Sequence, residues 1–156
     1  MEQRKEFPRM REDQGRGHQR IVFVACGKRK QQTKRPSLEL YTGQYFRLCL
    51  ALARSIVSDS HIYVLSAKYG VLSYEEVIEP YNVKLTDLSR SDLQQWRAEV
   101  KGFVLRKIQE GYKPVFICGD LYHQGLPGVK MLPKVAIGKQ IQFIQSQLKP
   151  RGLFDV

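Results

Sequence analysis

One short segment of the chain offers a carboxylate and an imidazole together. Asp120 and His123 are three residues apart, with Tyr122 between them, and they follow an apolar run that ends at Cys118. A carboxylate can orient a water molecule or stabilise a cationic sugar intermediate, and an imidazole can transfer a proton. We therefore treat Asp120 and His123 as candidate catalytic residues. A turn-capping aspartate and an exposed histidine are the structural alternative.

A second acid lies in a stretch without regular periodicity, from residue 73 to residue 88. Glu79 is followed there by Pro80, Tyr81 and Asn82. The stretch predicts a long ordered loop, and long loops in compact domains are often functional or mobile. Glu79 is accordingly the other candidate acid, and Tyr81 and Asn82 are candidate substrate-binding residues.

Two apolar runs, over 21–25 and 61–65, are each followed by a glycine and at least one lysine. Glycine lets the backbone approach a ligand closely, the ammonium of lysine binds phosphate, and a tyrosine ring can stack on a base. The repeated pattern therefore favours phosphate and base binding over solvated loops. For Lys68 or Tyr69 alone, a surface lysine or a core tyrosine is the alternative. The candidate ligand-binding residues of the two segments are Cys26, Gly27, Lys28, Lys30, Ser66, Lys68, Tyr69 and Gly70.

The three cysteines, Cys26, Cys49 and Cys118, are widely spaced and show no metal-ligand spacing, which predicts buried, reduced thiols. No metal or cofactor is therefore expected. Cys26, beside Lys28, is also a candidate nucleophile, with a structural thiol as the alternative. The Walker pattern, the dinucleotide glycine fingerprint and the nucleophile elbow are all missing, which argues against P-loop nucleotide hydrolysis.

The composition favours a partner that carries phosphate. Lys and Arg number 26 against 15 acids, a net charge of +11, and 42% of the 156 residues are hydrophobic, enough for one folded domain. Such a surface attracts nucleic acid (DNA or RNA) or a nucleotide, although it can also serve solubility alone. No apolar run approaches the length of a membrane span, and the first residues are too polar for a signal peptide, so a cytoplasmic protein without membrane association is expected. The sequence indicates no oligomeric state.

Hydrophobic periodicity predicts alternating strands and helices. Parallel pairing then gives an α/β fold, a three-layer α/β/α sandwich with a mainly parallel central sheet, over residues 21–156. The ligand crevice of such a sheet lies beyond the carboxyl ends of its strands, where three of the candidate segments would share one cleft. The elements expected in order are a flexible arm over 1–20, a strand over 21–25, a basic loop over 28–36, a helix over 42–57 capped by Thr42, a strand over 61–65 with a continuation at 71–72, a helix over 88–110, a strand over 114–118, a turn-rich loop over 119–128 and a helix over 138–148.

Four blocks of the chain resemble a poorly characterised family of bacterial and phage proteins, a domain of unknown function. That family is distantly similar to the uracil-DNA glycosylase superfamily, and two of its blocks also resemble a domain of archaeal tRNA-guanine modification enzymes. The resemblance implies a base-handling, uracil-DNA-glycosylase-like fold, and it adds Tyr41 and Phe46 to the substrate-binding residues. The blocks are Cys26-Gly27-Lys28-Arg29-Lys30, Leu40-Tyr41-Thr42-Gly43 with Phe46-Arg47, Leu65-Ser66-Ala67-Lys68-Tyr69-Gly70-Val71-Leu72, and Pro80-Tyr81.

One departure from the resembled proteins concerns the acid. Uracil-DNA glycosylases usually carry a water-activating acid in the loop after the first strand, where this chain has Cys26, Gly27 and basic residues. The resembled family often has an acid after its Pro-Tyr pair, where this chain has Asn82. An acid would therefore come from Asp120 or Glu79.

The leading hypothesis is a nucleic-acid-directed, glycosylase-like protein, which, if it is an enzyme, is a hydrolase that acts on N-glycosidic bonds. Phosphate would be bound by Lys28, Lys30 and Lys68, and Asp120 or His123 would assist the chemistry. A base would be held by Tyr41, Tyr69 and Tyr81. Two alternatives stay open: a non-catalytic nucleic-acid-binding accessory module, and an enzyme that acts on a small nucleotide or nucleoside.

Overall fold

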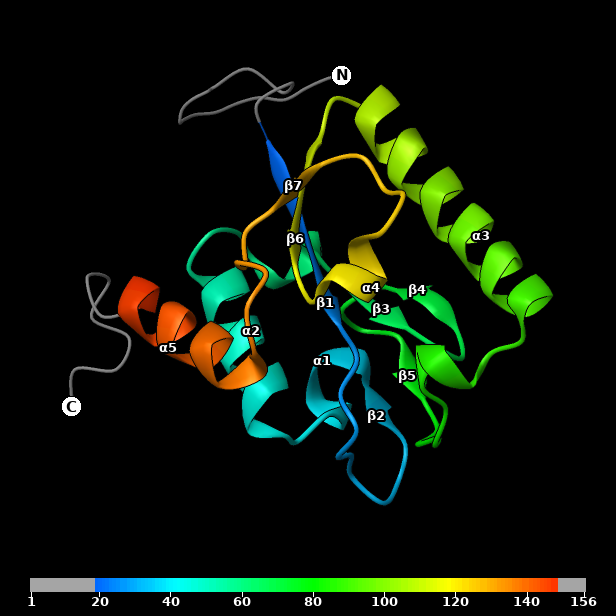
Figure 1. Cartoon of the computed structure of the whole chain (residues 1–156), viewed down its shortest axis with the longest axis horizontal. Helices are drawn as coiled ribbons and strands as arrows, with labels where there is room; N and C mark the ends of the chain where they lie inside the picture. Colours follow the sequence, from blue (N-terminus) through cyan, green and yellow to red (C-terminus); the bar gives the residue numbers. More distant parts are fainter. Residues whose placement is uncertain (1–18, 149–156) are drawn as a thin grey trace.

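The computed structural model describes residues 19–148, in which strands and helices alternate along the chain (Figure 1). Two short 3-10 turns, Asp59–His61 and Leu85–Asp87, lie in the connections. The elements are β1 (Arg20–Ala25), β2 (Arg35–Pro36), α1 (Ser37–Leu40), α2 (Gln44–Arg54), β3 (Ile62–Ser66), β4 (Gly70–Leu72), β5 (Val77–Ile78), α3 (Arg90–Gln109), β6 (Lys113–Ile117), α4 (Asp120–His123), β7 (Val129–Lys130) and α5 (Ile137–Leu148).

The central sheet has the strand order β4-β3-β1-β6-β7 and is mainly parallel. β1 pairs in parallel with β3 on one side and β6 on the other, so that Val22 lies opposite both Ile62 and Val115. β7 continues the sheet in parallel, whereas β4 pairs antiparallel with β3. The predicted α/β fold with a mainly parallel central sheet is thus confirmed.

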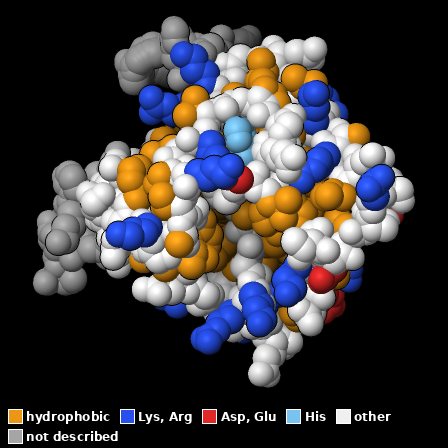
Figure 2. Space-filling view, viewed as in Figure 1, with side chains coloured by type: hydrophobic (Ala, Val, Ile, Leu, Met, Phe, Trp, Pro, Cys, Tyr) orange, Lys and Arg blue, Asp and Glu red, His pale blue; other side chains and the backbone are white. Residues whose placement is uncertain are grey.

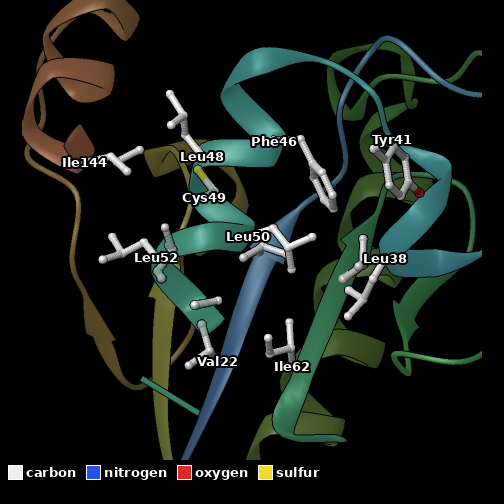
Figure 3. Packing of buried hydrophobic residues seen from close by; sticks show 14 of the residues in the cluster. Val22, Leu38, Tyr41, Phe46, Leu48, Cys49, Leu50, Leu52, Ile62 and Ile144 are labelled. Carbon is white, nitrogen blue, oxygen red and sulfur yellow. The ribbon is translucent and has the colours of Figure 1, made fainter. Parts of the chain in front are cut away.

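Helices cover both faces of this sheet (Figure 1). Successive residues of β1 alternate between the faces: Val22 and Val24 belong to the core beneath α2 and α5, and Phe23 belongs to the core beneath α3. Figure 3 shows the first core, in which Leu52 of α2 and Ile144 of α5 pack over the strands. A strand buried on both faces must be apolar throughout, which explains the continuous apolar run of β1.

The connections bring three strand ends to one edge of the sheet. From β1 the chain passes through α2 to β3, and from β3 it passes through α3 to β6, on the other side of β1. The carboxyl ends of β1, β3 and β6 therefore lie side by side. The chain leaves β1 toward β3 but leaves β6 toward β7, so the order reverses between β1 and β6, which is where ligands bind in open α/β sheets.

The long elements lie where the periodicity predicts them, within about three residues. Helix α3 begins after Ser89, whose Oγ accepts a hydrogen bond from the Asp92 N–H at 3.1 Å, and the chain turns away at Gly111, with a φ of +100°. The cap of α2 differs from the prediction, because Gly43 rather than Thr42 occupies that position and no side chain caps the helix.

The short elements differ from the predictions. The basic loop predicted over 28–36 ends in strand β2, which pairs antiparallel with β5, so the prediction of a loop is wrong for its last two residues. Pro36 is tolerated because β2 is a two-residue edge strand with few ladder hydrogen bonds. Asp120 to His123 form a one-turn helix instead of a turn, and the segment after Gly70 folds back as β4 instead of continuing the strand.

Two further expectations concern the chain ends and the membrane. The predicted arm over 1–20 lies outside the described residues except for its last two, of which Arg20 begins β1. Within residues 19–148, none of the helices combines the length and the apolar character that crossing a bilayer requires.

Gly128, in the loop between α4 and β7, should resist replacement. Its φ is +120°, and a Cβ there would lie 2.9 Å from both the Phe116 ring and the Pro114 carbonyl oxygen. Gly128→Ala should therefore lower the free energy of unfolding by about 2 kcal/mol in chemical denaturation. The control is Gly138→Ala, because nothing lies within 4 Å of that Cβ position. It should be neutral or stabilise the protein by up to about 1 kcal/mol, and equal losses in both variants would contradict this account.

Candidate functional site

The loops that follow β1, β3 and β6 meet around Cys26. The Cys26 N–H donates a hydrogen bond to the Leu65 carbonyl oxygen of β3 at 2.9 Å. Its Sγ lies 3.4 Å from the hydroxyl of Tyr122 in α4, a hydrogen bond in which either group can donate. Figure 2 shows this region at the centre of the face, where apolar side chains surround a hollow and Lys and Arg side chains lie around it. The three strand-end loops therefore lie together, and that they share one ligand cleft stays a prediction.

Three buried or half-buried hydroxyls form a hydrogen-bonded chain beside Cys26. Ser66 Oγ donates to Tyr81 Oη at 2.7 Å, and Tyr81 Oη lies 2.6 Å from Tyr41 Oη. Ser66 Oγ also accepts the N–H groups of Lys68 and Tyr69, at 3.2 and 3.0 Å. We call Ser66, Tyr81 and Tyr41 the hydroxyl chain. Burial raises the pKa of both tyrosines, so both stay protonated at neutral pH.

Trp96 connects the site to α3, and the sequence analysis did not single it out. Its indole N–H donates to the Ser66 carbonyl oxygen at 2.8 Å, and its ring meets the Tyr122 ring edge-on, with centroids 5.8 Å apart. Trp96 is 5% exposed. Its place on the buried side of a predicted helix was the available signal, but that signal does not distinguish a core tryptophan from one that bonds a strand end.

The three candidate lysines occupy different environments. Lys28 and Lys68 are exposed, whereas Lys30 is half-buried. Lys30 Nζ lies 4.7 Å from the centroid of the Tyr81 ring and 5.8 Å from that of the Tyr41 ring. It also donates to the Lys28 carbonyl oxygen at 2.9 Å. Burial lowers the pKa of Lys30, and the nearby Cys26 acts in the opposite direction.

Among the predicted base-binding aromatic residues, Tyr69 is the one that faces solvent. Tyr69 is 39% exposed, and Lys68 Nζ lies 5.3 Å from the centroid of the Tyr69 ring. Its ring also meets the Tyr81 ring edge-on, with centroids 5.4 Å apart. Tyr81 is half-buried and supports Tyr69 from beneath. Among these aromatic residues, Tyr69 is therefore the one that solvent reaches most.

Tyr41 and Phe46 cannot present their rings to a ligand, which corrects the expectation that they bind substrate directly. Each is 2% exposed, and their ring centroids lie 4.8 Å apart in the core beneath α2. Both support the loop after β1, because a Cβ at Gly27 would lie 3.4 Å from Phe46 Cβ and 3.9 Å from Tyr41 Cβ. Gly70, with a φ of +79°, serves the turn into β4.

Asp120 and His123 stand on α4, at the reversal point between β1 and β6. The Asp120 carboxylate lies 3.0 Å from Lys130 Nζ and 4.0 Å from Lys134 Nζ, and its side chain is 45% exposed. The His123 ring packs on Phe116, with centroids 4.8 Å apart. Its Nε2 is buried and has no hydrogen-bond partner among the described residues. A cavity of about 550 Å³ opens here, lined by Asp120, Leu121, His123, Gln124 and Lys134.

Glu79 and Asn82 do not join this cluster through polar contacts. Both are exposed, and within residues 19–148 neither makes a hydrogen bond or an ion pair. Asp120 is the better placed acid, because Tyr122 on the same helix contacts Cys26. Within the same residues, no three His, Cys, Asp or Glu side chains gather into a group that could hold a metal ion.

The fold and the cluster together define an α/β protein with a basic, tyrosine-rich site at the carboxyl edge of its sheet. Comparison with known families gives the narrower assignment. The model of a family of unknown function, DUF6884, matches residues 21–146, and the chain belongs to this family. The predicted membership of an uncharacterised family is thereby confirmed. No curated protein matches the sequence at a significant level.

Removal of the Ser66 hydroxyl should destabilise the site. Ser66 is fully buried, and Ser66→Ala would leave two backbone N–H groups and the Tyr81 hydroxyl without this partner. We expect a loss of about 2 kcal/mol in the free energy of unfolding. The control Ser146→Ala removes an exposed hydroxyl that bonds the Phe143 carbonyl oxygen; it should change stability by less than about 0.5 kcal/mol. Similar losses in the two variants would contradict the role of Ser66.

The three free thiols should differ in reactivity. Burial raises the pKa of Cys49 and of Cys118 to about 12, whereas Cys26 is half-buried at the site. Because the thiolate is the reacting species, Cys49 and Cys118 should resist an alkylating reagent at about pH 8 until the protein unfolds, and Cys26 should react first. Peptide mass mapping of the alkylated, folded protein measures this order. Labelling of Cys49 as fast as Cys26 would refute it.

Proposed function

We propose that the protein binds nucleic acid along its basic strand-end edge and handles a single base there, as a glycosylase-like protein. The observation that carries this proposal is the position of Tyr69, an exposed ring beside Lys68, on loops that meet the basic loop of β1 around Cys26. Positive charge beside an open aromatic ring suits the phosphate and the base of one nucleotide.

Phosphate binding would come from the exposed lysines at this edge. Lys28 and Lys68 are free of acidic partners among the described residues, and both side chains reach solvent. The net charge of +11 adds a long-range attraction toward a polyanion. Each phosphate that a lysine binds would release counterions, so binding would weaken as the salt concentration rises.

Base handling would use Tyr69 with Tyr81 beneath it. A base that has left its stack can lie on the Tyr69 ring, and the edge-on contact with Tyr81 holds that ring in place. The hydroxyl chain fixes Tyr81 in turn, because Ser66 and Tyr41 bond its hydroxyl from two sides. Tyr41 acts in this proposal as a support.

The chemistry would fall to Asp120. Cleavage of an N-glycosidic bond leaves positive charge on the sugar, which a carboxylate can stabilise while it orients the attacking water. Asp120 lines a cavity together with His123, whose unpartnered Nε2 could exchange a hydrogen bond with a ligand. Helices on both faces of the mainly parallel sheet agree with a three-layer sandwich of the uracil-DNA glycosylase kind, which supports this reaction class.

A specific observation favours a second candidate, a non-catalytic nucleic-acid-binding module. The Asp120 carboxylate already pairs with Lys130 at 3.0 Å, and that ammonium offsets the negative charge that a sugar cation would need. The loop after β1 supplies no acid in its place. Such a module would bind nucleic acid with the same residues and release no base.

The test is incubation of the protein with labelled single- and double-stranded oligonucleotides, including modified bases, followed by alkaline cleavage at abasic sites. We expect strand scission that falls at least about 100-fold in Asp120→Asn. The matched control is Asp59→Asn, because Asp59 is 42% exposed and pairs with Arg54 in the same manner, before β3 at the opposite edge of the sheet. Scission that survives in Asp120→Asn would remove Asp120 from the mechanism.

Binding is recorded on the same oligonucleotides at several salt concentrations. The double variant Lys28→Ala with Lys68→Ala should reduce the salt dependence, by about 0.9 in the logarithmic slope for each phosphate that the variant no longer binds. Replacement of Lys101 and Lys113, exposed lysines on α3 and at the start of β6, should have a smaller effect. Tight binding without scission would favour the module, and absence of binding would refute both candidates.

A further inference from the structure

Lys30 differs from the exposed lysines of the site in a way that suits covalent chemistry. Its side chain turns inward, so that Nζ lies over the rings of Tyr81 and Tyr41. An antiparallel bridge between the backbones of Lys30 and Tyr41 fixes the start of this side chain. Lys28 and Lys68 are both exposed, and Lys68 Nζ lies over one ring, that of Tyr69, at 5.3 Å. The position of the Lys30 amine is therefore set by the fold.

The neutral, nucleophilic form of this amine is more accessible than that of an exposed lysine. Burial lowers the pKa of Lys30, and within residues 19–148 no carboxylate forms an ion pair with its Nζ. A neutral amine can still donate one N–H to the Lys28 carbonyl oxygen, to which Nζ is bonded at 2.9 Å, and its lone pair stays free. The rings of the tyrosines attract the charged form, which limits how far the neutral form is populated.

Tyrosine hydroxyls lie near the amine. Tyr81, over whose ring Nζ lies, carries a hydroxyl that bonds both Ser66 and Tyr41. Burial raises the pKa of the two tyrosines, so their hydroxyls stay protonated at neutral pH and can donate a hydrogen bond, while solvent supplies the proton that formation of a protonated imine consumes. The amine supplies the nucleophile that imine formation needs, and the hydroxyl chain beside it offers a hydrogen-bond donor.

We propose that Lys30 is an amine nucleophile that forms an imine with the aldehyde of an abasic sugar; this inference rests on the proposed function. The Lys30 nitrogen adds to C1′ of the open-chain sugar, the carbonyl oxygen takes two protons and leaves as water, and a carbon–nitrogen double bond remains. In the protonated imine, water then takes a proton from C2′, the electrons of that C–H bond form a double bond between C2′ and C3′, and the bond between C3′ and the 3′-phosphate oxygen breaks with its electron pair on that oxygen. The phosphate leaves with that electron pair, so no oxidant or reductant is needed.

The experiment supplies an oligonucleotide with a preformed abasic site, together with borohydride as a hydride donor that reduces any imine to a stable secondary amine. Wild-type protein should form a covalent complex, and peptide mapping should place the sugar on Lys30. Lys30→Arg keeps the positive charge but has no amine that forms an imine, so the yield should fall by about tenfold or more. Lys101→Arg and Lys113→Arg, at exposed lysines on α3 and at the start of β6, are the matched controls and should keep the wild-type yield.

Binding of the same abasic oligonucleotide, and the thermal unfolding of each variant, are measured without borohydride. Binding without a covalent complex, or a complex mapped to any other amine, would overturn the role of Lys30 and leave the proposed nucleic-acid function intact. Absence of binding would overturn the proposed function itself, and the inference with it. The peptide map of the wild-type complex decides the question even if Lys30→Arg fails to fold.

Discussion

The site depends on one constraint, the burial of β1 between two parallel neighbours. Because β3 and β6 both run parallel to β1, their chains must leave the sheet at the same edge, and every crossover must return over a face. The crossovers through α2 and α3 cover opposite faces, which makes β1 apolar on both sides. The polar segments after the three strands are thereby brought together around Cys26, although they come from positions 26, 66 and 120 of the chain.

Polar groups brought together in this way must satisfy one another. Ser66 is fully buried, and it is tolerated there because its hydroxyl bonds Tyr81 and two backbone N–H groups. The same network orders the residues around it: Tyr81 supports the exposed ring of Tyr69 on one side and lies beneath the Lys30 amine on the other. The hydrogen bonds that satisfy the buried hydroxyls therefore also orient the candidate ligand-binding groups.

The acid takes an unusual place in this arrangement. The loop after β1 carries glycine, cysteine and cations, whereas the candidate carboxylate, that of Asp120, follows β6 on α4 and pairs with Lys130. An enzyme of this design would need its ligand to compete for the carboxylate, since the ion pair must loosen before Asp120 can support a sugar cation. A binding protein would keep the ion pair as it is. Opening of the ion pair between Asp120 and Lys130 on ligand binding would therefore distinguish the two functions proposed for this member of the DUF6884 family.

Local pattern determined the long elements, because a strand such as β1 or a helix such as α3 repeats its hydrophobic period over enough residues to show it. Local pattern also located the strand-end segments that carry lysine, serine and Asp120. The two-residue strands, the antiparallel turn of β4 and the one-turn helix α4 have no period to detect. Only the tertiary structure decided that Tyr41 is buried, that Lys30 turns inward and that Tyr69 stays open. Those outcomes depend on partners far along the chain, such as Tyr41 and Tyr81, forty residues apart.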